Sequence, residues 1–75
     1  MKNLYSGDVI IEFISFCIEN FKMEHNMKGK EVANLFNQSG VIDFLTDGYD
    51  ILHTQGKGYI IDEIEQFLKK RGYKI

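Results

Sequence analysis

Four residues of types that active sites use lie close together in the segment YDILHTQG, residues 49–56. A histidine there could act as a general base, a nearby aspartate could orient it, and a tyrosine or threonine could supply a hydroxyl group. On a helix, Asp50 and His53 are three residues apart and can touch. The candidate functional residues of a ligand-binding or catalytic site are therefore Tyr49, Asp50, His53 and Thr54.

The same segment has a purely structural interpretation, which we favour. His53 would close the C-terminus of a helix, where a cation or a hydrogen-bond donor is stabilising. Thr54 would then belong to the turn that follows. The sequence shows neither an activated nucleophile nor an oxyanion donor beside these two residues. It therefore predicts no catalytic residue, and a protein that is not an enzyme.

The other reactive and acidic residues do not form a metal or cofactor site. Cys17 lies on an apolar face, where a buried thiol behaves as a small hydrophobe, and one cysteine with two dispersed histidines lacks metal-ligand spacing. An acidic row, Asp43, Asp47 and Asp50, lacks the pattern of a calcium loop. We expect a solvated face there, with a basic partner as the alternative. The Gly-Lys-Gly run at 56–58 lacks the full phosphate-loop pattern and is interpreted as a loop. No cofactor and no metal are expected.

The 75-residue chain has 44% hydrophobic residues, a net charge of −2 and a single cysteine. This length holds one domain, residues 1–75, of globular composition. The lone cysteine fits a reducing, cytoplasmic location. Glu12 and Glu19 interrupt the apolar run near the start of the sequence, and no small-residue cleavage site follows it. The net negative charge gives no general attraction to nucleic acid or to an anionic membrane, so neither is expected as a partner.

The elements that must position the candidate residues are all helical, and one of them is central. In VIIEFISFCIENFKM, residues 9–23, the polar side chains fall in an arc of roughly 80° on a helical wheel, and apolar side chains occupy most of the rest. An ordinary surface helix has an apolar stripe only a little wider than about 100°. The sequence therefore predicts a mostly buried first helix, 8–25, with Asp8 as its N-cap and the other segments wrapped around it.

Three further helices, 30–38, 41–53 and 59–71, complete a predicted compact all-α bundle of about four helices. Gly48 lies inside the apolar face of 41–53, where a glycine indicates a close backbone approach to another helix, and we expect the first one. The alternative is a break at Gly48 into two short helices. The second and third helices have the outline of a helix-turn-helix. Aspartates on the outer face of 41–53 would repel DNA phosphates, which disfavours a nucleic-acid binder.

Several motifs together resemble those of a known family. They are FISFCIENFK (13–22), GKEV with a following LF (29–36), GVIDFL (40–45), YDILHTQG (49–56) and YIIDEIEQFLKKRG (59–72). With them the chain is similar to a group of small bacterial proteins of comparable length, grouped as a domain of unknown function, whose hallmark is the Leu52-His53-Thr54 triplet. Lys28 departs from the pattern, because relatives are expected to carry a Thr or Ser helix N-cap there. Asn26 must then cap, or the turn is looser.

The resemblance implies no assigned activity. It implies an accessory or neutralising partner of proteins similar to ADP-ribosyltransferases, which relatives are encoded beside. The residues themselves point the same way, because a chain this short cannot stack enough helix around 8–25 to cover its whole apolar arc. A partner protein or a second copy should cover the remainder. We therefore predict a protein–protein interaction module, with a homodimer as one form of it.

Overall fold

The structure, a computed structural model, describes residues 6–75. Over these residues the chain forms five helices and no strand: α1 (Gly7–His25), α2 (Gly29–Ser39), α3 (Val41–Asp47), α4 (Tyr49–Leu52) and α5 (Lys57–Lys70). The molecule measures 33 × 22 × 21 Å along its principal axes. The prediction of an all-α bundle is confirmed.

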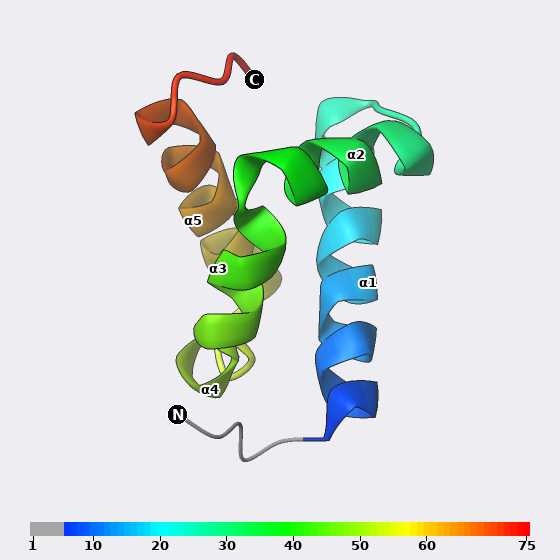
Figure 1. Cartoon of the computed structure of the whole chain (residues 1–75), viewed down its shortest axis with the longest axis vertical. Helices are drawn as coiled ribbons and strands as arrows, with labels where there is room; N and C mark the ends of the chain where they lie inside the picture. Colours follow the sequence, from blue (N-terminus) through cyan, green and yellow to red (C-terminus); the bar gives the residue numbers. More distant parts are fainter. Residues whose placement is uncertain (1–5) are drawn as a thin grey trace.

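The helices are arranged around α1, which runs the length of the molecule on one side (Figure 1). From its far end the chain turns into α2, which crosses over, and then descends through α3 and α4. It climbs again through α5, so that α1 and α5 run in the same direction and α3 in the opposite one. α1 packs against α2, α3 and α5, and α3 also packs against α5. α1 therefore has three neighbouring helices, but it is less buried than predicted, because among its residues only Ile10, Phe13, Cys17 and Phe21 are buried.

One apolar face from each of the longer helices builds the core. α1 contributes Phe13, Cys17 and Phe21, and the last two are fully buried. The rings of Phe21 and Phe36 meet edge to face, with centroids 5.2 Å apart, at the junction of α1 and α2. The other core residues are Val32, Val41, Leu45, Leu52, Ile60, Ile61, Ile64 and Leu68. The i, i+3, i+4 spacing in the sequence thus identified the buried faces correctly.

The caps of α1 differ from the predicted ones. The helix begins one residue earlier than expected, so Ser6, and not Asp8, is the N-cap: its Oγ accepts a hydrogen bond from the Val9 N–H at 3.5 Å. Asp8 instead lies in the first turn, where the helix dipole favours a carboxylate. At the other end Asn26 adopts a left-handed conformation, φ 52°, and terminates α1.

Asn26 therefore does not cap α2, contrary to expectation. Lys28 occupies the N-cap position of α2. Its backbone N–H donates to Glu31 Oε1 at 2.9 Å, which is one half of a capping box. The Glu31 carboxylate thus satisfies the backbone N–H of the N-cap residue, which is a different donor from the N–H groups that a Ser or Thr side chain at position 28 would satisfy.

The predicted continuous helix 41–53 is wrong, and the alternative, a break at Gly48, is the observed structure. The break is slight, because the Gly48 N–H still donates to the Phe44 carbonyl at 3.0 Å and the Gly48 carbonyl accepts from the Leu52 N–H at 2.8 Å. The predicted approach to the first helix is also wrong. A Cβ at position 48 would meet Leu52 Cδ1 at 3.0 Å and the Phe44 carbonyl oxygen at 3.1 Å, both within the same segment.

α5 begins at Lys57, two residues earlier than predicted, after an extended Gly56. Its apolar residues Ile60, Ile64 and Leu68 face the core, as the pattern indicated. None of the helices described in residues 6–75 has both the length and the apolarity that crossing a membrane requires.

Candidate functional site

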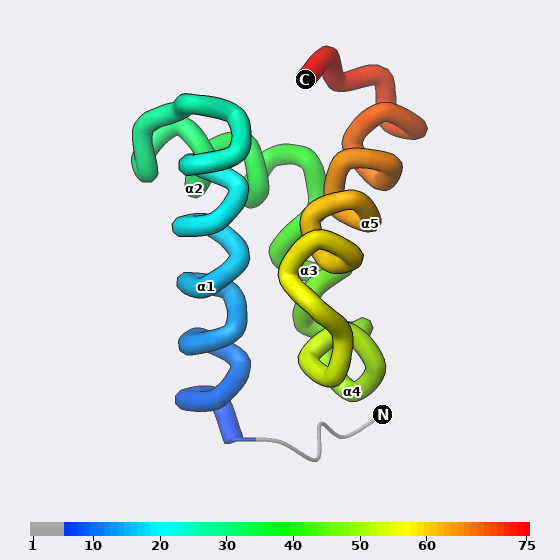
Figure 2. The backbone as a smooth tube through the Cα atoms, turned by 180° about the vertical axis from the view of Figure 1, so that it is seen from behind, coloured from blue at the N-terminus to red at the C-terminus, as the bar shows by residue number. Residues whose placement is uncertain are grey.

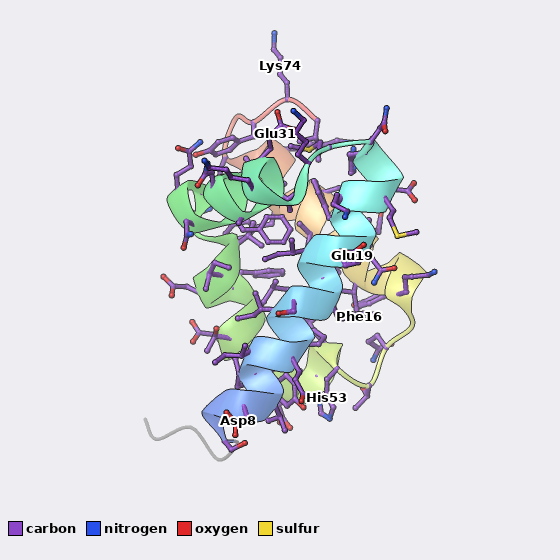
Figure 3. The ribbon with its side chains drawn as sticks, turned by 90° about the vertical axis from the view of Figure 1, so that its right-hand side faces the viewer. Asp8, Phe16, Glu19, Glu31, His53 and Lys74 are labelled. Atoms are coloured by element: carbon purple, nitrogen blue, oxygen red, sulfur yellow. The ribbon has the colours of Figure 1, made fainter. Side chains whose placement is uncertain are left out.

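The predicted residues of segment 49–56 do lie together, at the end of the molecule where α1 begins (Figure 3). The rings of Tyr49 and His53 stack with centroids 4.3 Å apart and an interplanar angle of 7°. His53 Nδ1 lies 2.6 Å from the Tyr49 carbonyl oxygen. Because a carbonyl oxygen only accepts, Nδ1 carries the proton and donates it.

These contacts close a helix end. The Thr54 hydroxyl donates to the Ile51 carbonyl at 2.7 Å, and the backbone N–H groups of His53 and Thr54 donate to the carbonyls of Tyr49 and Ile51. A hydroxyl that donates to the last carbonyls of a helix satisfies groups that would otherwise lack partners. The geometry therefore favours the structural interpretation of His53 and Thr54. Ligand binding by Tyr49, Asp50, His53 and Thr54 stays a prediction.

Cys17 is the most deeply buried nucleophile in the described chain. It is 0% exposed between α1 and its neighbours, and burial raises the pKa of its thiol from 9.0 to about 12. At neutral pH it is therefore a protonated thiol that packs as a small apolar group. Within residues 6–75 no three histidine, cysteine or carboxylate side chains come close enough together to hold a metal ion.

A concave feature lies elsewhere, between α1 and α5. It is a half-open groove of about 440 Å³, and Figure 2 shows the two helices side by side on this face of the molecule. We call it the α1–α5 groove. α1 contributes Asn20, Met23 and Glu24, and α5 with its first turn contributes Lys57, Gly58, Ile61, Asp62 and Glu65.

An ion pair links the two walls of the groove at one end. His25 Nε2 lies 2.8 Å from Glu65 Oε2, and the two side chains are only 21% and 23% exposed. The His25 ring also stacks on Phe21, with centroids 4.2 Å apart. The pair thus holds the last turn of α1 against the middle of α5. Sequence reasoning missed it because the partners are 40 residues apart, although His25 follows Phe21 by one turn on the buried face.

Two large apolar side chains of α1 stay uncovered beside this groove. Phe16 is 44% exposed and Met23 is 67% exposed. They are seven residues apart, which places them two turns apart on the same side of the helix. Phe16 points outward toward the segment that leads into α5 (Figure 3), and Met23 lines the groove itself. We call these two residues the outer strip. The wrapping of α1 predicted from its wide apolar arc is therefore incomplete.

Three of the four charged side chains that line the groove are acidic. Glu24 stands on the α1 wall, and Asp62 and Glu65 stand on the α5 wall, against a single lysine, Lys57. Asp62 Oδ2 accepts a hydrogen bond from Gln66 Nε2 at 2.9 Å, which holds the carboxylate in place. The groove is thus apolar at its base, through Ile61, and negative at its edges.

Comparison with known proteins assigns a family without assigning an activity. A family model described as a protein of unknown function, DUF3791, matches residues 12–71, which include every motif that carried the sequence resemblance except the last residue of YIIDEIEQFLKKRG. No curated protein matches the chain, and no solved structure matches it. Because the model covers most of the 75 residues, the chain belongs to the DUF3791 family of proteins of unknown function.

Proposed function

We propose that this protein is a cytoplasmic protein–protein interaction module, without catalytic activity of its own, that binds a partner through the outer strip and the α1–α5 groove. The observation that carries the proposal is the exposure of Phe16 and Met23 on one side of the central helix. Scattered exposed apolar residues are normal on any protein surface. Phe16 and Met23 lie on one side of α1 beside a groove, with the polar Asn20 between them, and exposed apolar residues gathered at a groove are typical of interaction sites.

Exposing the apolar side chains of the outer strip to water is unfavourable, and a partner that buries them would gain that free energy. Burying apolar surface is worth roughly 25 cal/mol per Å², and phenylalanine and methionine are among the side chains with most to gain. Met is also enriched at protein interfaces, because its flexible side chain adapts to different partners. Elsewhere on α1 the same residue types are covered: Phe21 and Phe13 are buried.

A different protein is favoured over a second copy of this chain. A two-fold dimer brings the same patch of both copies together. Across the groove it would set Glu24, Asp62 and Glu65 of one copy against the same carboxylates of the other, and like charges in an interface are costly. The resemblance of the sequence further implies that the partner is similar to an ADP-ribosyltransferase and is encoded beside this protein.

A co-expression pull-down tests the proposal with the full chain. The double variant Phe16→Ser, Met23→Ser removes the outer strip, and the matched variant Ile11→Ser, Ile51→Ser removes two comparably exposed apolar residues away from the groove. We expect the wild type and the matched variant to retain a protein encoded by a neighbouring gene as a stoichiometric complex, and the outer-strip variant to lose it.

Light scattering coupled to size-exclusion chromatography provides the second readout. We expect the isolated chain to be a monomer at micromolar concentration, and its mass to rise only when the partner is added. Equal retention of the partner by the outer-strip variant would show that binding uses another face and would refute the proposal. A dimer that the outer-strip variant dissociates would replace the partner with a second copy.

A further inference from the structure

The α1–α5 groove lies where a further helix would pack in a helical bundle. α1 and α5 run in the same direction as two neighbouring walls, and α3 packs against both of them from the other side (Figure 2). Bundles of this kind place a fourth helix in the angle between two such walls, where its side chains enter the space between them. The groove of about 440 Å³ lies in that angle.

The apolar part of the groove suits one face of a helix. Ile61 lies at its base and is 8% exposed, Met23 stands above it, and Phe16 extends the apolar surface along α1. Helices that dock in grooves do so through apolar residues at i, i+3, i+4 and i+7. Phe16 and Met23 are two turns apart on α1, and apolar residues seven positions apart on a bound helix have the same spacing.

The charged residues at the edges of the groove indicate which side chains should lie on either side of the apolar face of a bound helix. Glu24 on one wall faces Asp62 and Glu65 on the other, and Lys57 is the lysine among the lining residues. Glu65 already pairs with His25, and Asp62 accepts from Gln66, but a carboxylate has capacity for further donors. Lysine or arginine on both sides of the apolar face would therefore complement the groove.

Among residues 6–75, no helix is free to occupy the groove of a second copy. The basic end of α5, with Lys69, Lys70 and Arg71, belongs to a helix whose apolar face, Ile60, Ile64 and Leu68, is already buried in the core. Lending α5 to a second copy would require unfolding the donor. The α5 helix is therefore not the occupant of the groove, and the charge of the groove favours a basic helix of a different protein.

We infer that the α1–α5 groove binds one basic amphipathic helix of a different protein, with its apolar face on Met23, Ile61 and Phe16 and its lysine or arginine side chains on Glu24 and Asp62. The inference rests on the proposed function and adds the chemistry of the partner to it. Binding would complete a four-helix bundle around α1.

Model peptides of about 18 residues, which is long enough to follow the groove, test the inference. The first contains only leucine and lysine, with leucines at helical spacing. The second has glutamate in place of lysine, and the third has the composition of the first in an order without an apolar face. Fluorescence anisotropy gives each Kd, and amide chemical shifts of the labelled protein locate the site. We expect the first peptide to bind at least about tenfold more tightly than the other two, with shifts confined to α1 and α5.

Two charge variants separate a specific effect from the net charge of the protein. Glu24→Gln with Asp62→Asn neutralises the groove, and Asp43→Asn with Asp47→Asn makes the same change of charge on exposed residues of α3. At low salt we expect the first variant to weaken binding of the basic peptide about fivefold and the second to weaken it less than about twofold. Glu65 is left intact because it pairs with His25.

The outcomes distinguish this inference from the proposed function. Equal binding of the acidic peptide, or equal losses in the two charge variants, would overturn the basic helix while a pull-down that depends on Phe16 and Met23 still upholds an interaction module. Chemical shifts outside α1 and α5, or no binding of any peptide at millimolar concentration, would also overturn it. Binding of the basic peptide that survives Phe16→Ser, Met23→Ser, together with a pull-down that survives it, would refute both.

Discussion

Phe21 and Phe16 are the same residue type, on the same helix, five positions apart, yet one is 0% and the other 44% exposed. Phe21 is enclosed by the His25 ring and by Phe36 of α2. Phe16 lies on a side of α1 that the other helices of residues 6–75 cover only in part. The comparison teaches that the hydrophobic character of α1 serves two ends: its inner face stabilises the fold, and its outer strip is available to a partner.

The largest expected effect on stability comes from removing the buried phenylalanine ring of Phe21. Phe21→Ala removes a fully buried phenylalanine and leaves a cavity among α1, α2 and α5, so we expect about 3–5 kcal/mol less free energy of unfolding. Urea denaturation followed by circular dichroism measures it. Phe16→Ala is the matched control and should cost far less. Similar losses in the two variants would mean that the two faces of α1 do not differ in the way described.

The second expectation concerns the buried thiol of Cys17 and the pH dependence of stability. Because the pKa of Cys17 is raised to about 12, the folded protein holds a proton that the unfolded chain releases above pH 9. The unfolded state then binds fewer protons, so stability falls as pH rises from 9 toward 12, by up to about 1.4 kcal/mol per pH unit. Cys17→Ala should lack this slope, and the difference between the two proteins cancels the titration of lysines and tyrosines.

Thiol labelling extends the same test to the outer strip. In the Cys17→Ala background, Phe16→Cys places a thiol on the exposed side of α1. We expect it to react with a thiol reagent at the rate of an unstructured peptide, whereas Cys17 in the wild type reacts only when the protein opens. Equal rates would contradict the burial of Cys17.

A smaller effect is expected from the ion pair that joins α1 to α5. His25→Gln and Glu65→Gln each remove one partner of a pair whose side chains are about one fifth exposed, and we expect each to cost about 1 kcal/mol. The double variant should cost less than the sum, because the interaction is lost only once. Lys22→Gln is the control, since its pair with Glu19, at 3.2 Å, lies within α1. Additive losses for His25 and Glu65 would show that the two side chains do not interact.

The smallest effect is expected on the outer strip. Phe16→Ser and Met23→Ser remove side chains that solvent already reaches, so the free energy of unfolding should change by no more than about 0.5 kcal/mol each. Thermal denaturation measures the change. A large loss of stability would assign these side chains to the core and would remove the argument that they await a partner.

Much of the fold could be predicted because it depends on patterns among residues that are close together in the sequence. Apolar residues at helical spacing placed Val32, Phe36, Ile64 and Leu68 in the core. Gly40, φ 92°, lies where a left-handed residue must end α2. The break at Gly48 was the less favoured interpretation, because the apolar pattern continues across it, as the helical hydrogen bonds do in the structure.

The candidate site was predicted less well. The cluster around His53 was found because its members are neighbours in the sequence. The edge-to-face contact of the Tyr49 ring with Phe13 of α1, at 5.2 Å between centroids, was not predicted because its partners lie far apart in the chain. The α1–α5 groove was missed because its two walls are separated by more than thirty positions in the chain and by three other helices. The wide apolar arc predicts that other segments or a partner cover α1. It does not predict which part of the arc remains exposed to solvent.

The sequence by itself determined that the domain is all helical and that Cys17 is buried, since both follow from the periodicity of single segments. Only the tertiary structure decided that His25 meets Glu65 and that Phe16 and Met23 remain bare beside a negative groove. The physical reason is that periodicity defines which side chains share a face, whereas exposure depends on how two faces from distant segments pack together.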